Sequence, residues 1–206
     1  MATANPLERI FSVDYKSKIQ PRISVCKWGE GLENLCGSKA VTIDNTTGDI
    51  YVADSWKNCV KAFDNNGQIM FKFGSEEGEG KMKRPNGLAI ILNRILITHR
   101  SNYILIYQLD GEFVSRIGDP EKGELEFEDP SSLTFDESNG EIFICDSGNN
   151  RIQILSKELT YKTHFGQDKL KYPLDIKLSK NSFIFLIILI ILVFICTITI
   201  IFYIRV

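Results

Sequence analysis

Residues 144–155 read ICDSGNNRIQIL, and residues 52–63 read VADSWKNCVKAF. Both stretches hold a short apolar run, an Asp, a small polar turn that ends in Asn, and a second run of mixed character. In the first stretch Arg-Ile-Gln-Ile at 151–154 alternates polar and apolar side chains, which is typical of a half-buried β-strand. Each stretch therefore predicts two short strands joined by a tight turn.

The same order of features recurs along the middle of the chain. Each unit ends in an aromatic or aliphatic residue followed by Gly, with Gly-to-Gly spacings of 45, 44 and 48; the pairs are Trp28-Gly29, Phe73-Gly74, Ile117-Gly118 and Phe165-Gly166. Between these pairs lie four strand-like runs separated by turns rich in Asp, Asn and Gly. Four short strands in about 45 residues are typical of a β-propeller blade.

The sequence thus predicts an all-β protein, an incomplete β-propeller of about three four-stranded blades. An N-terminal segment, 1–21, precedes the propeller region, 22–180. The blades are predicted at about 30–74, 75–118 and 119–166, and a fourth begins at 167–180.

The two quoted stretches resemble the central motif of NHL repeats, and the resemblance covers about residues 22–180. The copy at 96–102, LITHRSN, departs from the motif because Thr98 stands where the motif has Asp. The resemblance implies a six-bladed propeller of the kind found at the end of tripartite-motif ubiquitin ligases, which binds proteins or RNA. No Cys/His ladder of a RING or B-box precedes the repeats, so ligase activity is not carried over.

Three blades and one strand are fewer than the four to eight that close a propeller, and an unclosed array leaves strand edges unpaired. We therefore expect either self-association that completes the ring or a fragment of a longer propeller. Arg22–Trp28 is predicted to be a lone outer strand of the type that completes the last blade of a closed ring.

The segment from Phe183 to Ile204 carries no charge. A 22-residue helix is about 33 Å long, which suffices for a hydrocarbon layer of about 30 Å. The segment is therefore predicted to be a transmembrane helix. Two alternatives stay open. Its β-branched residues favour strands in water, and it begins where the second strand of the fourth blade would start; a wrongly joined exon would also read this way.

A helix at 183–204 implies a single-pass, tail-anchored membrane protein. Lysines upstream of the segment place the propeller on the cytosolic side by the positive-inside rule; they are Lys169, Lys171, Lys177 and Lys180.

The chain has 24 basic and 26 acidic residues and a pI near 5.8, which argues against a strongly basic nucleic-acid binder. Its five cysteines show no C-x-x-C pair, so they predict neither a zinc site nor a disulfide framework. His99 and His164 are its only histidines and lie in different blades. We expect no catalytic residue, metal or cofactor.

Two pairs recur with Asp-x-x-x-Asn spacing: Asp54 with Asn58, and Asp146 with Asn150. We interpret them as turn-forming residues, because an Asp at such a position accepts backbone N–H groups. The alternative is that they line one face of the propeller as ligands.

Trp56 and Arg100 lie at turn positions where propellers expose side chains, and both residue types are frequent at interaction hot spots. We predict that they bind a protein partner of unknown identity. The expected function is a binding module at a membrane surface. The alternatives are a fragment of a propeller enzyme with a metal-dependent central site, as in lyases and lactonases, and an RNA-binding NHL domain, which the acidic composition disfavours.

Overall fold

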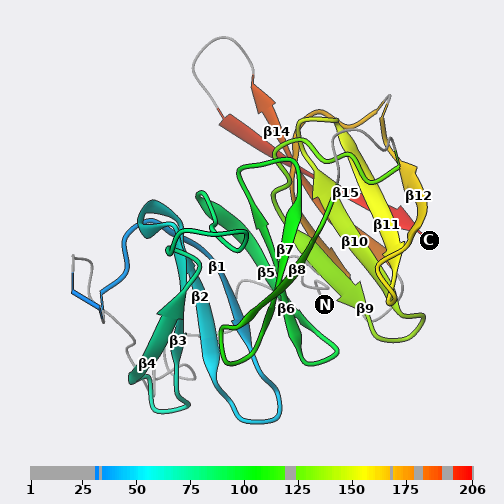
Figure 1. The fold of residues 1–206 in the computed structure, drawn as a ribbon. Helices are drawn as coiled ribbons and strands as arrows, with labels where there is room; N and C mark the ends of the chain where they lie inside the picture. The colour runs from blue at the N-terminus through cyan, green and yellow to red at the C-terminus, as the bar shows by residue number, and fades with distance from the viewer. Residues whose placement is uncertain are drawn as a thin grey trace, which may run out of the picture.

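The computed structural model describes residues 31–32, 34–118, 124–167, 169–178, 183–191 and 197–205. Its strands form four antiparallel sheets that follow one another along the chain (Figure 1). The first sheet contains β1 (Ser38–Ile43), β2 (Ile50–Asp54), β3 (Cys59–Phe63) and β4 (Ile69–Phe73). The second contains β5 (Pro85–Ile91), β6 (Arg94–His99), β7 (Ile104–Gln108) and β8 (Phe113–Ile117).

The third sheet contains β9 (Leu133–Asp136), β10 (Glu141–Asp146), β11 (Arg151–Ser156) and β12 (Tyr161–Phe165). The fourth contains β13 (Pro173–Leu178), β14 (Phe183–Ile191) and β15 (Thr197–Arg205). In each sheet the strands are paired in chain order, so each sheet is a meander. The prediction of an all-β chain with three four-stranded units is confirmed.

Asx turns set the first hairpin of the first and third sheets. The Asp44 Oδ1 atom accepts the N–H of Thr46 at 2.9 Å, and Gly48 takes a φ of 82°. In the third sheet the Asp136 Oδ1 atom accepts the N–H of Ser138 at 2.9 Å. These local bonds reverse the chain over a few residues and place the next strand alongside the first.

The sheets pack face to face, with the first strands β1, β5, β9 and β13 in successive contact. The central strands are buried on both faces, and alternate residues of one strand serve different cores. In β6, Ile95 and Ile97 face the first sheet, whereas Leu96 faces the third. Phe143 and Ile152 pack in the core that extends to Ile176 of the fourth sheet. The result is a row of propeller-type blades whose first strands lie together.

The prediction of a helix at 183–204 is wrong: this part of the chain contains two strands. The backbone of β14 pairs with β13 at Leu178↔Ile184, and β15 pairs with β14 from Phe183↔Arg205 to Ile191↔Thr197. Ile, Phe and Thr favour strands, and β13 offers an unpaired edge at the point where a blade has its second strand. Pairing with that edge satisfies the backbone of β14, so a strand forms here in place of a helix.

Within the described residues no helix has the length and apolar character needed to cross a membrane. Tail anchoring and a cytosolic orientation stay predictions. The expected outer strand Arg22–Trp28 lies outside the described residues.

Candidate functional site

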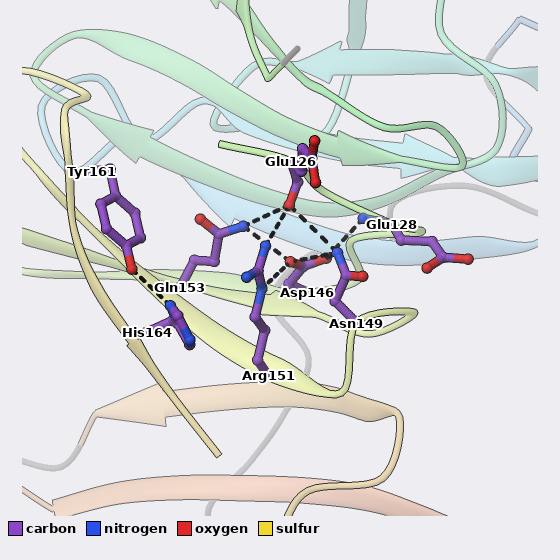
Figure 2. A network of polar contacts seen from close by, with 8 residues as sticks. All are labelled: Glu126, Glu128, Asp146, Asn149, Arg151, Gln153, Tyr161 and His164. Atoms are coloured by element: carbon purple, nitrogen blue, oxygen red, sulfur yellow. Dashed lines mark hydrogen bonds and ion pairs between the residues drawn. The ribbon is translucent and has the colours of Figure 1, made fainter. Parts of the chain in front are cut away.

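The turn between the second and third strands of the third sheet encloses a buried carboxylate, Asp146 (Figure 2). Its Oδ1 accepts the N–H of Glu128 at 2.8 Å. Its Oδ2 pairs with Arg151 Nε at 2.8 Å and accepts Gln153 Nε2 at 3.0 Å. Arg151 and Gln153 also donate to the carbonyl oxygen of Glu126, at 2.7 and 2.8 Å. This network fixes the turn to the loop that enters the sheet.

The first sheet repeats this arrangement with a different cation. The Asp54 side chain is fully buried, its Oδ1 accepts the N–H of Cys36 at 3.0 Å, and its Oδ2 lies 2.9 Å from Lys61 Nζ. The lysine side chain is 3% exposed and also donates to the carbonyl of Asn34. Asp54 and Asp146 are thus engaged with the protein's own backbone and cations, and they do not face solvent.

The second sheet has no acid at this position. His99 stands there, because it ends β6 as Asp54 and Asp146 end β2 and β10; Thr98 precedes it and donates its hydroxyl to the carbonyl of Ser131 in the third sheet. His99 is 1% exposed and lies between two partners: its Nδ1 accepts the N–H of Lys83 at 3.1 Å, and its Nε2 lies 3.0 Å from Ser101 Oγ. Burial lowers the pKa of His99 to about 4, so the ring is neutral near pH 7.

The bonding of His99 assigns its tautomer. Because Nδ1 accepts a backbone N–H, the ring proton lies on Nε2 and points at the oxygen of Ser101. A histidine that activates a serine must instead accept the hydroxyl proton. This pair therefore orders the loop and does not form a nucleophile. Among the described residues, no three His, Cys, Asp or Glu side chains gather as metal ligands.

Asn58 and Asn150 have left-handed backbones, with φ of 54° and 56°. Their side chains reach into the following sheet. The Asn58 Oδ1 atom accepts the N–H of Arg84, and the Asn150 Oδ1 atom accepts the N–H of Tyr172, each at 2.8 Å. The Asn of each turn thus holds the residue that precedes the first strand of the next sheet.

The residues at this preceding position share a strained backbone. Arg84, Asp129 and Tyr172 have φ of 48°, 47° and 49°, and each stands directly before a proline. A left-handed backbone is uncommon for residues with a side chain, and a following proline favours an extended one. The first sheet has Gly37 here, with φ 69°, and the ring of Trp56 lies where its Cβ would be.

A groove with a volume of about 830 Å³ runs across the first strands of the four sheets. We call it the inner-strand groove. Its charged and larger polar lining residues are Lys39, Arg84, Asn86, Arg100, Asp129, Tyr172, Asp175 and Lys177. The three strained residues therefore share one surface with Arg100. Trp56 is 64% exposed and lies over Gly37, two residues before Lys39.

Each acid of the groove already accepts a hydrogen bond from a side chain, whereas its arginines have no carboxylate partner among the described residues. The Tyr172 hydroxyl donates to Asp129 Oδ2, and this bond raises the pKa of Tyr172 to about 12 although the nearby charge of Arg100 opposes the rise. The Asp175 Oδ1 atom accepts the hydroxyl of Ser132 at 2.7 Å. Within the described part of the chain, neither Arg84 nor Arg100 pairs with a carboxylate.

Sequence reasoning identified Arg100 and Trp56 but missed Arg84, Asp129 and Tyr172. A signal was available, because a proline follows each of these residues at the start of three successive repeats. The sequence pattern did not reveal their left-handed backbones, since the bonds that hold two of them come from the preceding repeat.

Comparison with known proteins agrees with the motif. The NHL repeat family matches residues 127–155. The brain tumor protein of Drosophila melanogaster is 32% identical over 108 residues, which are 49% of this chain and 10% of that protein. The predicted resemblance to NHL repeats is confirmed.

Two solved structures share the fold. Hydrazine synthase of Kuenenia stuttgartiensis matches with a TM-score of 0.61 at 11% identity, over 84% of this chain and 46% of that one. A catalytically inactive virginiamycin B lyase from Staphylococcus aureus matches with a TM-score of 0.60 at 18% identity, over 78% of this chain and 50% of the lyase. This chain spans about half the length of each.

Proposed function

We propose that this chain, which carries an NHL repeat on a fold of propeller-type blades, is a non-catalytic module that binds a protein partner through the inner-strand groove. The observation that carries the proposal is a pair of arginines, Arg84 and Arg100, that have no carboxylate partner in the described part of the chain and lie on an open surface beside an exposed tryptophan. Arg and Trp are frequent among residues that dominate binding energy. The turns that present Trp56 and Arg100 are fixed by buried hydrogen bonds from neighbouring residues.

The rigid scaffold supports a binding role. A side chain that is held before the partner arrives loses less conformational entropy on binding. The backbone N–H of Trp56 donates to the carbonyl of Cys36 at 3.2 Å, and the N–H of Arg100 donates to the carbonyl of Lys83 at 2.8 Å. Both side chains thus start from a fixed backbone.

The test is capture of partners by the full chain and by a variant with both Trp56→Ala and Arg100→Ala, quantified by mass spectrometry. We expect the proteins bound by the wild type to fall at least about tenfold with the variant. Leu92→Ala is the matched control, because Leu92 is also 64% exposed but does not line the groove. Equal loss with the control, or no loss with the double variant, contradicts the proposal.

Self-association is a second proposal. In the described part of the chain, β15 has a paired neighbour on one side only, so its outer edge is available to another strand. We expect the purified chain to sediment as a dimer or larger species, and a strictly monomeric chain at about 50 μM would argue against it. Membrane attachment stays a proposal as well, and partition of the full chain into detergent is the measurement that decides it.

A further inference from the structure

Three successive sheets place a residue with a side chain at a position where glycine is the unstrained choice. Arg84, Asp129 and Tyr172 keep φ near 48° before a proline, against both the left-handed penalty and the pre-proline preference. Strain of this kind persists only where the surrounding structure holds it, and it is concentrated at functional sites. The hydrogen bonds from Asn58 and Asn150 hold two of the three residues.

The fold itself does not need a side chain at this position. The first sheet has Gly37 there and forms the same four-stranded meander as the next two sheets. The three side chains therefore add something that the scaffold does not require. All three line the inner-strand groove.

The chemistry of the groove indicates what it receives. Arg84 and Arg100 are exposed and have no carboxylate partner in the described residues. Each guanidinium can therefore bind an anion by donating two N–H groups to it. The Tyr172 hydroxyl is engaged by Asp129, which holds the ring in place and leaves a carboxylate at that end. Val41 adds an exposed apolar surface to the lining.

This arrangement favours a peptide over a nucleic acid. A polynucleotide brings a negative charge at every residue, and on this surface its path would pass the carboxylates of Asp129 and Asp175. A peptide can place Glu or Asp at the arginines and apolar or neutral residues at the other contacts.

Resting on the proposed function, we propose that the inner-strand groove binds an extended acidic segment of a partner protein, and that the strained residues Arg84, Asp129 and Tyr172 determine its specificity. Arg84 and Arg100 receive the acidic side chains. Asp129, with Tyr172 bound to it, disfavours an acidic side chain directly beside its own carboxylate.

The test measures binding and stability in the same variants. The probe is a fluorescein-labelled twelve-residue peptide that repeats Glu-Ser-Leu, followed by fluorescence anisotropy with the full chain. We expect saturable binding that weakens as NaCl rises, and no saturable binding of the matched Lys-Ser-Leu peptide. Arg84→Gly is expected to weaken binding of the Glu peptide at least about fivefold while the Tm stays equal or rises, because glycine relieves the left-handed strain.

The matched control is Leu92→Gly. Leu92 has φ 49° in the turn between β5 and β6, but it lies outside the lining of the inner-strand groove. This variant should also keep or raise the Tm, and it should leave peptide binding unchanged. Asp129→Gly should instead tighten binding of the Glu peptide, because it removes the carboxylate that excludes acidic side chains.

The outcomes separate this inference from the proposed function. Equal binding of the Glu and Lys peptides, or full binding by Arg84→Gly, overturns the inference and leaves a protein-binding groove. Tighter binding of a twelve-nucleotide single-stranded RNA than of the Glu peptide, with loss in Arg84→Gly, also overturns it, in favour of RNA. A lower Tm in Arg84→Gly would show that the Arg84 side chain stabilises the fold, and this too would overturn the inference.

Discussion

The turns of the first and third sheets each enclose a buried carboxylate with its cation, whereas the corresponding turn of the second sheet encloses a neutral threonine and histidine. Asp54 with Lys61, and Asp146 with Arg151, hold the loop that enters their own sheets. In the second sheet Leu105 stands at the lysine position, and His99 accepts the N–H of Lys83. Turns at the same place in the sheet are thus compatible with a charged and with a neutral interior.

The buried Asp of the repeat is therefore needed only together with its cation. The turn also forms where neutral side chains replace both. A buried ion pair carries a large desolvation cost and is often replaceable by neutral side chains of similar volume, but removal of one partner leaves an uncompensated charge. In the second sheet neutral residues replace both the acid and the cation.

The largest effect is expected from breaking the pair in the first sheet. Asp54→Thr leaves the buried ammonium of Lys61 without its partner and should lower the free energy of unfolding by about 3–5 kcal/mol. Adding Lys61→Leu makes this interior neutral, as it is in the second sheet, and should recover more than half of the loss. Urea unfolding of both variants and of Lys61→Leu alone gives the coupling energy. A double variant as unstable as Asp54→Thr would refute the equivalence of the two interiors.

The next effect is a pH dependence that only the second sheet should show. His99 has a pKa of about 4 when folded and about 6.5 when unfolded, so between these values the unfolded chain binds a proton that the folded chain does not. The contribution of neutral His99 to the free energy of unfolding is fully present above pH 6.5. It is lost as the pH falls to 4, which lowers the free energy of unfolding by about 3 kcal/mol. His99→Ser, which removes the titrating ring, should flatten this part of the profile. An unchanged slope would mean that other groups cause it.

The smallest effect concerns the contacts between sheets. Ser147 Oγ donates to the carbonyl of Pro173 at 2.6 Å, and Ser55 Oγ donates to that of Pro85 at 2.7 Å, so each joins its sheet to the next. Ser147→Ala leaves the buried carbonyl with one donor fewer and should lower the free energy of unfolding by about 1–2 kcal/mol. Ser55→Ala should cost a similar amount. Thermal unfolding of both resolves such a change, and a loss below about 0.3 kcal/mol in both would show that packing alone joins the sheets.

Much of the fold could be predicted because its signals are local. The turns at Asp44 and Asp136 form through bonds to residues two positions away, so composition was sufficient to locate them. The strands of 183–205 could not be separated from a helix in this way. Their pairing depends on the edge of β13, which a window over the apolar segment does not contain.

The candidate site was less predictable because its contacts also join residues that are far apart in the sequence. The sequence marked Thr98 as a departure from the motif, but it did not show that His99 takes over the contact to the incoming loop. At Arg84 and Tyr172 the local rule fails, since a residue before proline is expected to be extended. The side chains of Asn58 and Asn150 override it from 26 and 22 residues away.

The bonds between Asn58 and Arg84 and between Asn150 and Tyr172 place each of these two groove residues and its supporting Asn in neighbouring repeats. Duplication of one repeat would therefore bring both parts: an Asn that supports the next groove residue and a groove residue that the previous Asn supports. A lengthened array would gain one recognition position for every repeat added, in register with the others. Substitution at such a position would alter selectivity and leave the support untouched, which suits this architecture to divergence by duplication followed by single-residue change.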